Sequence, residues 1–232
     1  MTNALSFLSD LRSYLRGSRD RDQRAFYDLE SSLPYFDQVN RILCKDKRRV
    51  ILEFLAPPHA VGDAILEIGC GVGHFARILA DRGESVVGID LSARKIEKAR
   101  KLSQRYPSRA LTFLESDFRE FNAESSRQGA AGAFSRILAS DVVEHIPWEP
   151  AQTVRKLRDL AAPGGQIVVS VPSKMCMNDP GHIWKLLPDE WDQVFRAEGL
   201  RVERKQMSRI CWYWLKTPLP LAMVFSLRKG DA

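Results

Sequence analysis

Three glycines at alternate positions follow a short apolar run and precede a helical pattern. Gly69, Gly71 and Gly73 stand in A-I-L-E-I-G-C-G-V-G-H-F, where glycine lets the chain turn sharply and its backbone approach a ligand closely. A second apolar run ends at Asp90, about 20 residues beyond the first glycine, where a carboxylate can accept the hydroxyls of a ribose. This spacing predicts a ribose-containing ligand over the turn. The plainer alternative is an ordinary glycine turn of an α/β protein.

Two residues around the turn argue against a dinucleotide. The pyrophosphate fingerprint needs glycine at its sixth position, and His74 occupies that position here. Glu67 precedes the first glycine, and its carboxylate would repel a pyrophosphate but attract a ligand with an ammonium or sulfonium charge. The turn therefore favours a positively charged ligand.

The elements that must position these residues alternate between strand and helix. Apolar runs typical of buried strands occupy 64–68, 86–89, 111–114, 134–139, 166–171, 200–206 and 221–227. Helical patterns cover 74–83, 92–106, 150–160 and 188–198, with Ser92 as an N-cap, and 162–165 reads as a turn. No helical period separates the last two strands. The order predicts an α/β fold with a mostly parallel sheet and an antiparallel last strand.

The joint order of the motifs resembles that of class I S-adenosylmethionine-dependent methyltransferases, in the small-molecule group that includes the ubiquinone-biosynthesis O-methyltransferases. The turn is followed in the expected order by D-V-V-E-H-I-P, A-P-G-G-Q-I-V-V-S-V-P-S and G-H-I-W-K-L-L-P-D-E-W-D-Q-V-F-R-A-E-G-L. The resemblance implies a Rossmann-like, seven-stranded sheet with helices on both faces and S-adenosyl-L-methionine as cofactor. It implies an enzyme that methylates oxygen or nitrogen of a small acceptor, including apolar and lipid-linked ones.

The same resemblance implies roles for residues at the turn and at the strand ends. Glu67 would orient the methionine ammonium, and Gly69, Gly71 and Gly73 would let the backbone approach the cofactor. Asp90 would accept both ribose hydroxyls. The remaining contacts would come from Leu91 against adenine, Asp117 at the adenine amino group, Phe118 beside it and Ser140 at the methionine end. For both aspartates, capping of a helix or turn is the alternative interpretation.

The chain length fits one α/β domain with an extension, which gives two predicted parts. Residues 1–56 would form an N-terminal helical arm and cap, and residues 57–232 the methyltransferase domain. The charged stretch 1–24 can cover the cofactor, pack on a partner or be loosely ordered, and the sequence does not choose. The aromatic segment 210–220 leaves a similar choice between core packing, an apolar acceptor wall, a membrane contact and a dimer contact.

Methyl transfer needs little chemistry from the protein, because a sulfonium is already a strong electrophile and alignment supplies most of the acceleration. A base is needed only where the acceptor must lose a proton, and His182 and His145 are the candidates because imidazole titrates near neutrality. Glu144, as the strand neighbour of His145, would point to the opposite side. The run from Asp141 to His145 also resembles the E-x-x-E-H run that binds magnesium in some ubiquinone O-methyltransferases and small-RNA 2′-O-methyltransferases. The shorter aspartate departs from that run, so we predict no metal.

A net charge of +6 suits acidic acceptors, RNA or an anionic membrane surface, although a solvated basic surface explains it equally well. The basic run 45–49 is interpreted as part of such a surface. An RNA methyltransferase is the second hypothesis, but no N-P-P-[YF]-like run follows the fourth strand and no RNA-binding module is recognisable. A non-catalytic scaffold is the third hypothesis, and the intact glycine turn and Asp90 argue against it.

The remaining features predict a cytoplasmic protein with a small-molecule acceptor as its partner. The four cysteines form no C-x-x-C pair, so neither a zinc site nor a disulfide framework is indicated. The first residues lack the apolar core of a signal peptide, and no apolar run approaches transmembrane length. Peripheral contact with a membrane and the oligomeric state are left open.

Overall fold

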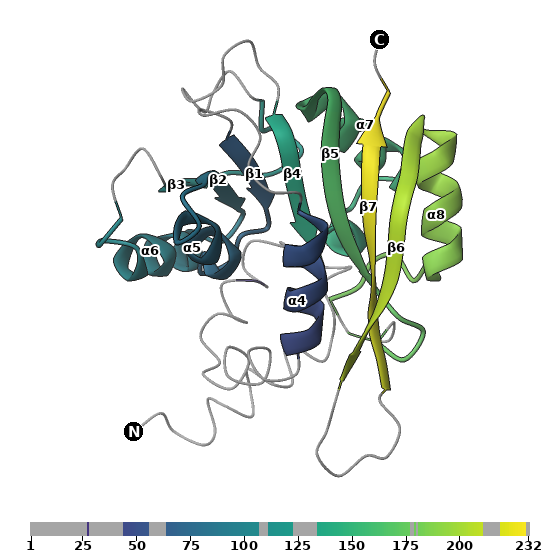
Figure 1. The fold of residues 1–232 in the computed structure, drawn as a ribbon, viewed down its shortest axis with the longest axis horizontal. Helices are drawn as coiled ribbons and strands as arrows, with labels where there is room; N and C mark the ends of the chain where they lie inside the picture. Colours follow the sequence, from purple (N-terminus) through teal and green to yellow (C-terminus); the bar gives the residue numbers. More distant parts are fainter. Residues whose placement is uncertain are drawn as a thin grey trace.

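The computed structural model describes residues 27, 44–55, 64–106, 111–122, 134–176, 179, 181–210 and 219–230. The strands among them form one seven-stranded sheet (Figure 1). The strands are β1 (Ala64–Ile68), β2 (Ser85–Asp90), β3 (Leu111–Glu115), β4 (Phe134–Ser140), β5 (Ala161–Pro172), β6 (Leu200–Ile210) and β7 (Leu219–Lys229). Their order across the sheet is β3-β2-β1-β4-β5-β7-β6.

The pairing of the strands follows from the connections between them. β1 pairs in parallel with β2 and β4, β2 with β3, and β4 with β5. β7 is antiparallel to both β5 and β6. A parallel neighbour requires a crossover connection, and the last two strands lack the helical sequence that would provide one. The predicted Rossmann-like sheet with an antiparallel last strand is confirmed.

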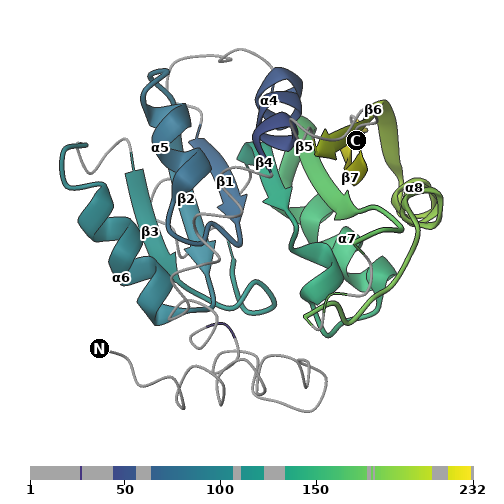
Figure 2. The same cartoon turned by 90° about the horizontal axis from the view of Figure 1, so that it is seen from below.

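Helices cover both faces of the sheet, as predicted (Figure 2). Helices α4 (Lys45–Phe54), α5 (His74–Ala80) and α6 (Ala93–Leu102) share one buried apolar cluster with the sheet, and α7 (Pro150–Leu160) and α8 (Pro188–Ala197) share the other. Consecutive residues of β1 alternate between the clusters, with Ile65 in the first and Leu66 in the second. This alternation is the period of two that a strand buried on both faces requires.

Several local predictions differ from the structure. Helix α5 ends at Ala80 and not at Gly83, and β6 extends to Ile210, beyond its predicted end at Gln206. Helix α6 ends at Leu102, not at Tyr106, because the chain turns there and the Tyr106 hydroxyl donates to Asp81 Oδ1 at 2.7 Å. The predicted turn at 162–165 lies within β5 and interrupts its pairing with β4. Phe134 pairs with Ala161, but the next paired residue, Arg136, pairs with Gln166. Residues Val143–His145 form a 3-10 turn, so the strand geometry assumed for Glu144 and His145 is wrong.

The N-terminal part is described only in places. Helix α4 packs against β6 and β7, and its inward face carries Val50, Ile51 and Phe54, as the helical spacing predicts. The charged stretch 1–24 and residues 211–218 of the aromatic segment lie outside the described residues. Among the residues that are described, no helix has the length and apolar character needed to cross a bilayer.

Candidate active site

The glycine turn connects β1 to α5 through backbone conformations that other residues rarely adopt. Gly69, Gly71 and Gly73 have φ angles of 65°, 53° and 72°. A side chain at Gly69 would also collide with a neighbour, because a Cβ there would lie 2.4 Å from Cγ2 of Val142. The turn therefore requires glycine for its conformation, and at Gly69 also for its close contact with the segment that follows β4.

The carboxylate of Asp90 ties the glycine turn to the next helix. Its Oδ2 accepts a hydrogen bond from the Gly71 backbone N–H at 2.8 Å, and its Oδ1 accepts one from the Ser92 N–H at 2.9 Å. The Ser92 hydroxyl in turn accepts from the Lys95 N–H, so the predicted N-cap of α6 is confirmed. Asp90 thus stands at the carboxyl end of β2, the edge where open α/β sheets bind ligands.

A cavity of about 430 Å³ opens at this edge of the sheet. Seven of the predicted site residues line it: Gly69, Asp90, Leu91, Asp117, Phe118, His145 and His182. Four predicted site residues are not part of its lining: Glu67, Gly71, Gly73 and Ser140. The cavity therefore joins the residues predicted for the cofactor to the two histidines predicted for the chemistry.

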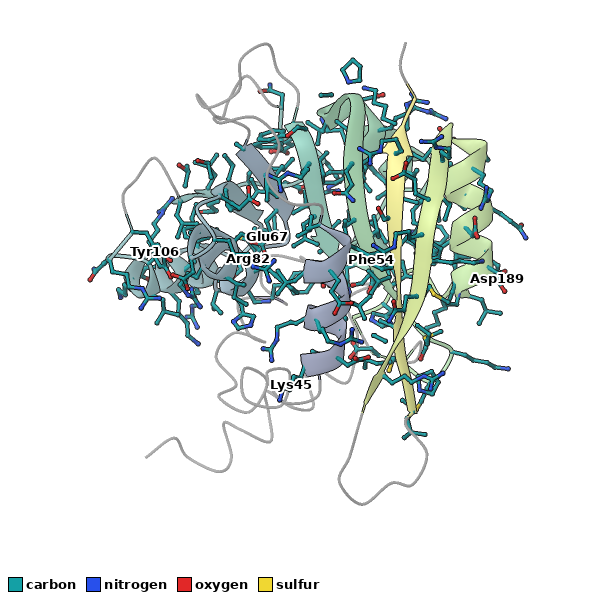
Figure 3. The ribbon with its side chains drawn as sticks, in the orientation of Figure 1. Lys45, Phe54, Glu67, Arg82, Tyr106 and Asp189 are labelled. Carbon is teal, nitrogen blue, oxygen red and sulfur yellow. The ribbon has the colours of Figure 1, made fainter. Side chains whose placement is uncertain are left out.

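Glu67, labelled in Figure 3, lies in strand β1. Only 4% of its surface is exposed. Burial raises the pKa of its carboxyl to about 8, although the backbone N–H of Ala76, in the first turn of α5, favours the charged form. Its Oε2 has no hydrogen-bond partner among the described residues. The side chain is thus a buried acid next to the turn and outside the cavity lining.

Asp117 lines the cavity but is also engaged locally. Its Oδ1 accepts from the Arg119 backbone N–H at 2.8 Å, and its Oδ2 accepts from Arg119 Nη2 at 2.6 Å. This is the turn-capping arrangement that was the alternative interpretation. Phe118 follows it and meets Trp148 edge to face, with ring centroids 6.4 Å apart.

Ser140 ends β4 and points to the neighbouring strand. Its hydroxyl lies 3.1 Å from that of Ser170 on β5. The next residue, Asp141, has a positive φ of 54°, which no other described non-glycine residue has. The Ser170 hydroxyl donates to Asp141 Oδ1 at 2.8 Å, and the Asp141 N–H lies 3.1 Å from the same hydroxyl. The two serines therefore hold the turn that leaves β4.

The 3-10 turn at Val143–His145 brings three polar groups together. Glu144 is fully buried, and burial raises the pKa of its carboxyl well above the ordinary range. Its Oε1 lies 3.9 Å from His182 Nε2, and the rings of His182 and His145 have centroids 4.8 Å apart. His145 Nδ1 lies 2.7 Å from the carbonyl oxygen of Gly181. Because a carbonyl only accepts, Nδ1 carries the proton and Nε2 is the basic atom of a neutral ring.

Backbone hydrogen bonds fix the segment that carries His182. The N–H groups of Ile183 and Trp184 both donate to the Glu144 carbonyl oxygen, at 2.9 and 3.0 Å. The Trp184 indole donates to the carbonyl oxygens of Ile146 and Trp148, at 3.0 and 2.8 Å. Two segments 36 to 40 positions apart thus meet beside the two histidines of the cavity.

Sequence reasoning missed three residues that line the cavity from the N-terminal part, namely Tyr27, Cys44 and Lys47. Lys47 was assigned to a solvated surface, but it is only 6% exposed. Its helical spacing relative to Val50, Ile51 and Phe54 could have revealed it, because these positions share one face. The ring of Tyr27 lies 5.0 Å from Lys95 Nζ and meets His145 edge to face at 5.8 Å. No sequence signal distinguished this tyrosine.

A family model described as a methyltransferase domain matches residues 35–217. The ubiquinone biosynthesis O-methyltransferase of Pseudomonas paraeruginosa is 34% identical over 144 residues, which cover 62% of this chain and 58% of that relative. The chain therefore spans little more than half the length of this curated relative.

Solved structures share the fold at low sequence identity. Magnesium protoporphyrin IX methyltransferase from Synechocystis, with bound SAM, has a TM-score of 0.66 and 19% identity, covering 92% of this chain and 100% of that one. The 1,6-didemethyltoxoflavin-N1-methyltransferase of Burkholderia thailandensis has a TM-score of 0.65 and 18% identity, covering 100% and 92%. Given the fold, the cavity at the carboxyl ends of the strands and a family model that matches most of the chain, the protein belongs to the class I methyltransferases, the family that uses S-adenosyl-L-methionine.

Proposed function

We propose that this protein transfers the methyl group of S-adenosyl-L-methionine to a hydroxyl oxygen of a small acceptor. The observation that carries the proposal is the single cavity that joins Asp90 to His145 and His182. Oxygen is favoured over nitrogen because the curated relative is an O-methyltransferase by name. An apolar or lipid-linked acceptor remains part of the proposal, since Ile146, Pro147 and Pro172 line the cavity.

The residues around the cavity suit the cofactor. Each oxygen of Asp90 accepts one backbone N–H and keeps a lone pair for a ribose hydroxyl. Leu91 and Phe118 offer apolar surface for adenine, and Asp117 offers a carboxylate beside it. Glu67 would act on the methionine ammonium through water, because its side chain stays outside the cavity lining. When bound, the cofactor supplies an electrophilic methyl group on a sulfonium.

The chain's own contribution to the chemistry is alignment and removal of a proton. His145 would take the acceptor's hydroxyl proton at Nε2, because its Nδ1 proton is held by the Gly181 carbonyl oxygen. His182 lies in ring contact with His145 and beside the Glu144 carboxyl, where it can share the positive charge that develops. Replacement of either histidine by asparagine should therefore lower the transfer rate more than it lowers cofactor affinity.

Calorimetric titration with S-adenosyl-L-methionine tests the cofactor half of the proposal. Replacing Asp90 by alanine should weaken binding by about 1–3 kcal/mol, the cost of losing a buried hydrogen-bond partner. Glu97→Gln is the matched control, because Glu97 is an exposed carboxylate on α6 outside the cavity lining. No binding by the unmodified protein would contradict the proposal and favour a scaffold.

Transfer of radiolabelled methyl groups to fractionated cell extract tests the acceptor half. Label in a solvent-extractable fraction, unchanged by ribonuclease, is the expected result. Label that disappears after ribonuclease treatment would contradict the small-molecule acceptor and favour the RNA alternative.

A further inference from the structure

Lys47 lies on helix α4, and its ammonium group reaches the part of the cavity that Asp141 and Glu144 line. It shares the buried face of α4 with Val50, Ile51 and Phe54, which anchor the helix on the sheet. Figure 3 labels Lys45 and Phe54, at the two ends of this helix. Core packing of the helix therefore fixes the position of the Lys47 ammonium, and Lys47 is not a mobile surface side chain.

The partner of this ammonium is Asp141, whose carboxylate is engaged on both oxygens. Lys47 Nζ donates to Oδ2, and the Ser170 hydroxyl donates to Oδ1 at 2.8 Å. Burial disfavours charge on both side chains, but their mutual attraction outweighs it. The pKa of Lys47 therefore lies above its ordinary range and the pKa of Asp141 below its own. The pair remains charged inside the fold.

Three polar side chains of this region form a cluster without Asp141. Glu144, His145 and His182 each offer one ligand atom, and these atoms lie within 4.8 Å of one another. Both carboxylate oxygens of Glu144 lack a hydrogen-bond partner among the described residues. Magnesium prefers oxygen ligands, whereas this cluster of described residues offers one carboxylate and two imidazoles. The residues therefore do not fit the set of magnesium ligands in the E-x-x-E-H run. The acid at the first position of that run is paired with a lysine here.

We propose that Lys47 is a built-in cation of the acceptor site, which withholds Asp141 from any divalent ion and supplies positive charge to the cavity in its place. This inference deepens the proposed function and rests on it for the identity of the acceptor site. A fixed ammonium at this place stabilises negative charge on an acceptor oxygen that has lost its proton.

Titration with manganese(II) chloride, followed by calorimetry, tests the inference without any acceptor. Lys47→Met should bind Mn²⁺ roughly tenfold or more tightly than the unmodified protein, because a repelling unit charge is lost and Asp141 is released. Lys47→Arg keeps the charge and should keep the weak binding. Adding Asp141→Asn to Lys47→Met should remove the gain. Lys45→Met is the matched control, because Lys45 is an exposed lysine on the same helix.

Three results would overturn the inference. Equal Mn²⁺ affinity of the unmodified protein and Lys47→Met, including no binding by either, would show that Lys47 withholds nothing. Micromolar binding by the unmodified protein would contradict it as well. Should Lys47→Met fail to fold, Asp141→Asn alone provides a test. Weaker Mn²⁺ binding by Asp141→Asn than by the unmodified protein would mean that Asp141 is already a ligand. Failure of S-adenosyl-L-methionine to bind would overturn the proposed function and leave these metal titrations unaffected.

Discussion

The backbone N–H of Gly71 donates to Oδ2 of Asp90 across 2.8 Å, and this bond joins two strand ends. β1 and β2 are parallel neighbours, with Ile68 opposite Ile89, so the glycine turn and the acid leave the sheet at the same edge. A separation of 19 positions in the sequence thus becomes a direct contact. The proposed binding of the cofactor's ribose by Asp90 depends on this contact.

The glycine turn provides a matched pair of substitutions. Both Gly69 and Gly71 have a positive φ, but a Cβ at Gly71 would meet no atom within 4 Å, whereas a Cβ at Gly69 would collide with Val142. Gly71→Ala should cost about 1–2 kcal/mol of folding free energy through backbone strain. Gly69→Ala should cost about 1–3 kcal/mol more through overpacking. Urea unfolding measures both. Adding Val142→Ala should recover part of the second cost, and equal costs for the two glycines would contradict the packing argument.

Glu67 should make stability depend on pH. Burial raises the pKa of its carboxyl from 4.5 to about 8, so the folded state holds a proton that the unfolded chain releases between these values. The folded state then binds more protons, and stability falls as pH rises through this window. Glu67→Gln should abolish this loss of stability. At pH 8 the free energy of unfolding of this variant should exceed that of the unmodified protein by roughly a few kcal/mol. Urea unfolding from pH 4 to 9 measures it, and parallel pH profiles of the two proteins would contradict the assignment.

Arg136 and Glu84 form a buried ion pair away from the cavity, with side chains 1% and 5% exposed and N–O distances of 3.0 and 2.5 Å. Arg136→Met or Glu84→Met alone should cost about 3–5 kcal/mol, because each removes the oppositely charged partner of a buried charge. The double replacement should cost less than either single one. A double-mutant cycle by chemical denaturation measures this coupling, and additive costs would show that the two charges are independent.

Trp184 should hold the His182 segment in place. Trp184→Phe removes the indole donor to the carbonyl oxygens of Ile146 and Trp148, and it should cost about 1–2 kcal/mol of stability. Hydrogen exchange at the Ile183 N–H, which donates to the Glu144 carbonyl oxygen, should become faster. Exchange at the core strand β4 is the internal control. Unchanged protection of Ile183 would mean that the backbone alone docks this segment.

The fold was predictable because its determinants are local. Short continuous apolar runs and a period of about 3.6 residues distinguish buried strands from helices, and Ser92 and the glycines mark their ends. The cofactor side was largely predictable for the same reason. Asp90, Leu91, Asp117 and Phe118 follow strand ends directly, and parallel strands bring those ends to one edge of the sheet.

The histidine side of the cavity, which we propose for the acceptor, depended on tertiary structure. The positive φ of Asp141 and the 3-10 turn after it decide where Glu144 and His145 point, and residue types alone do not specify that geometry. Lys47 looked like a surface charge within a basic run, and its burial appears only when α4 docks on the sheet. The amino-acid sequence by itself determined the order of the elements and the glycine turn that we propose for the cofactor. The packing of distant segments decided which charges meet in the cavity, because side chains from separate elements become neighbours only once the chain is folded.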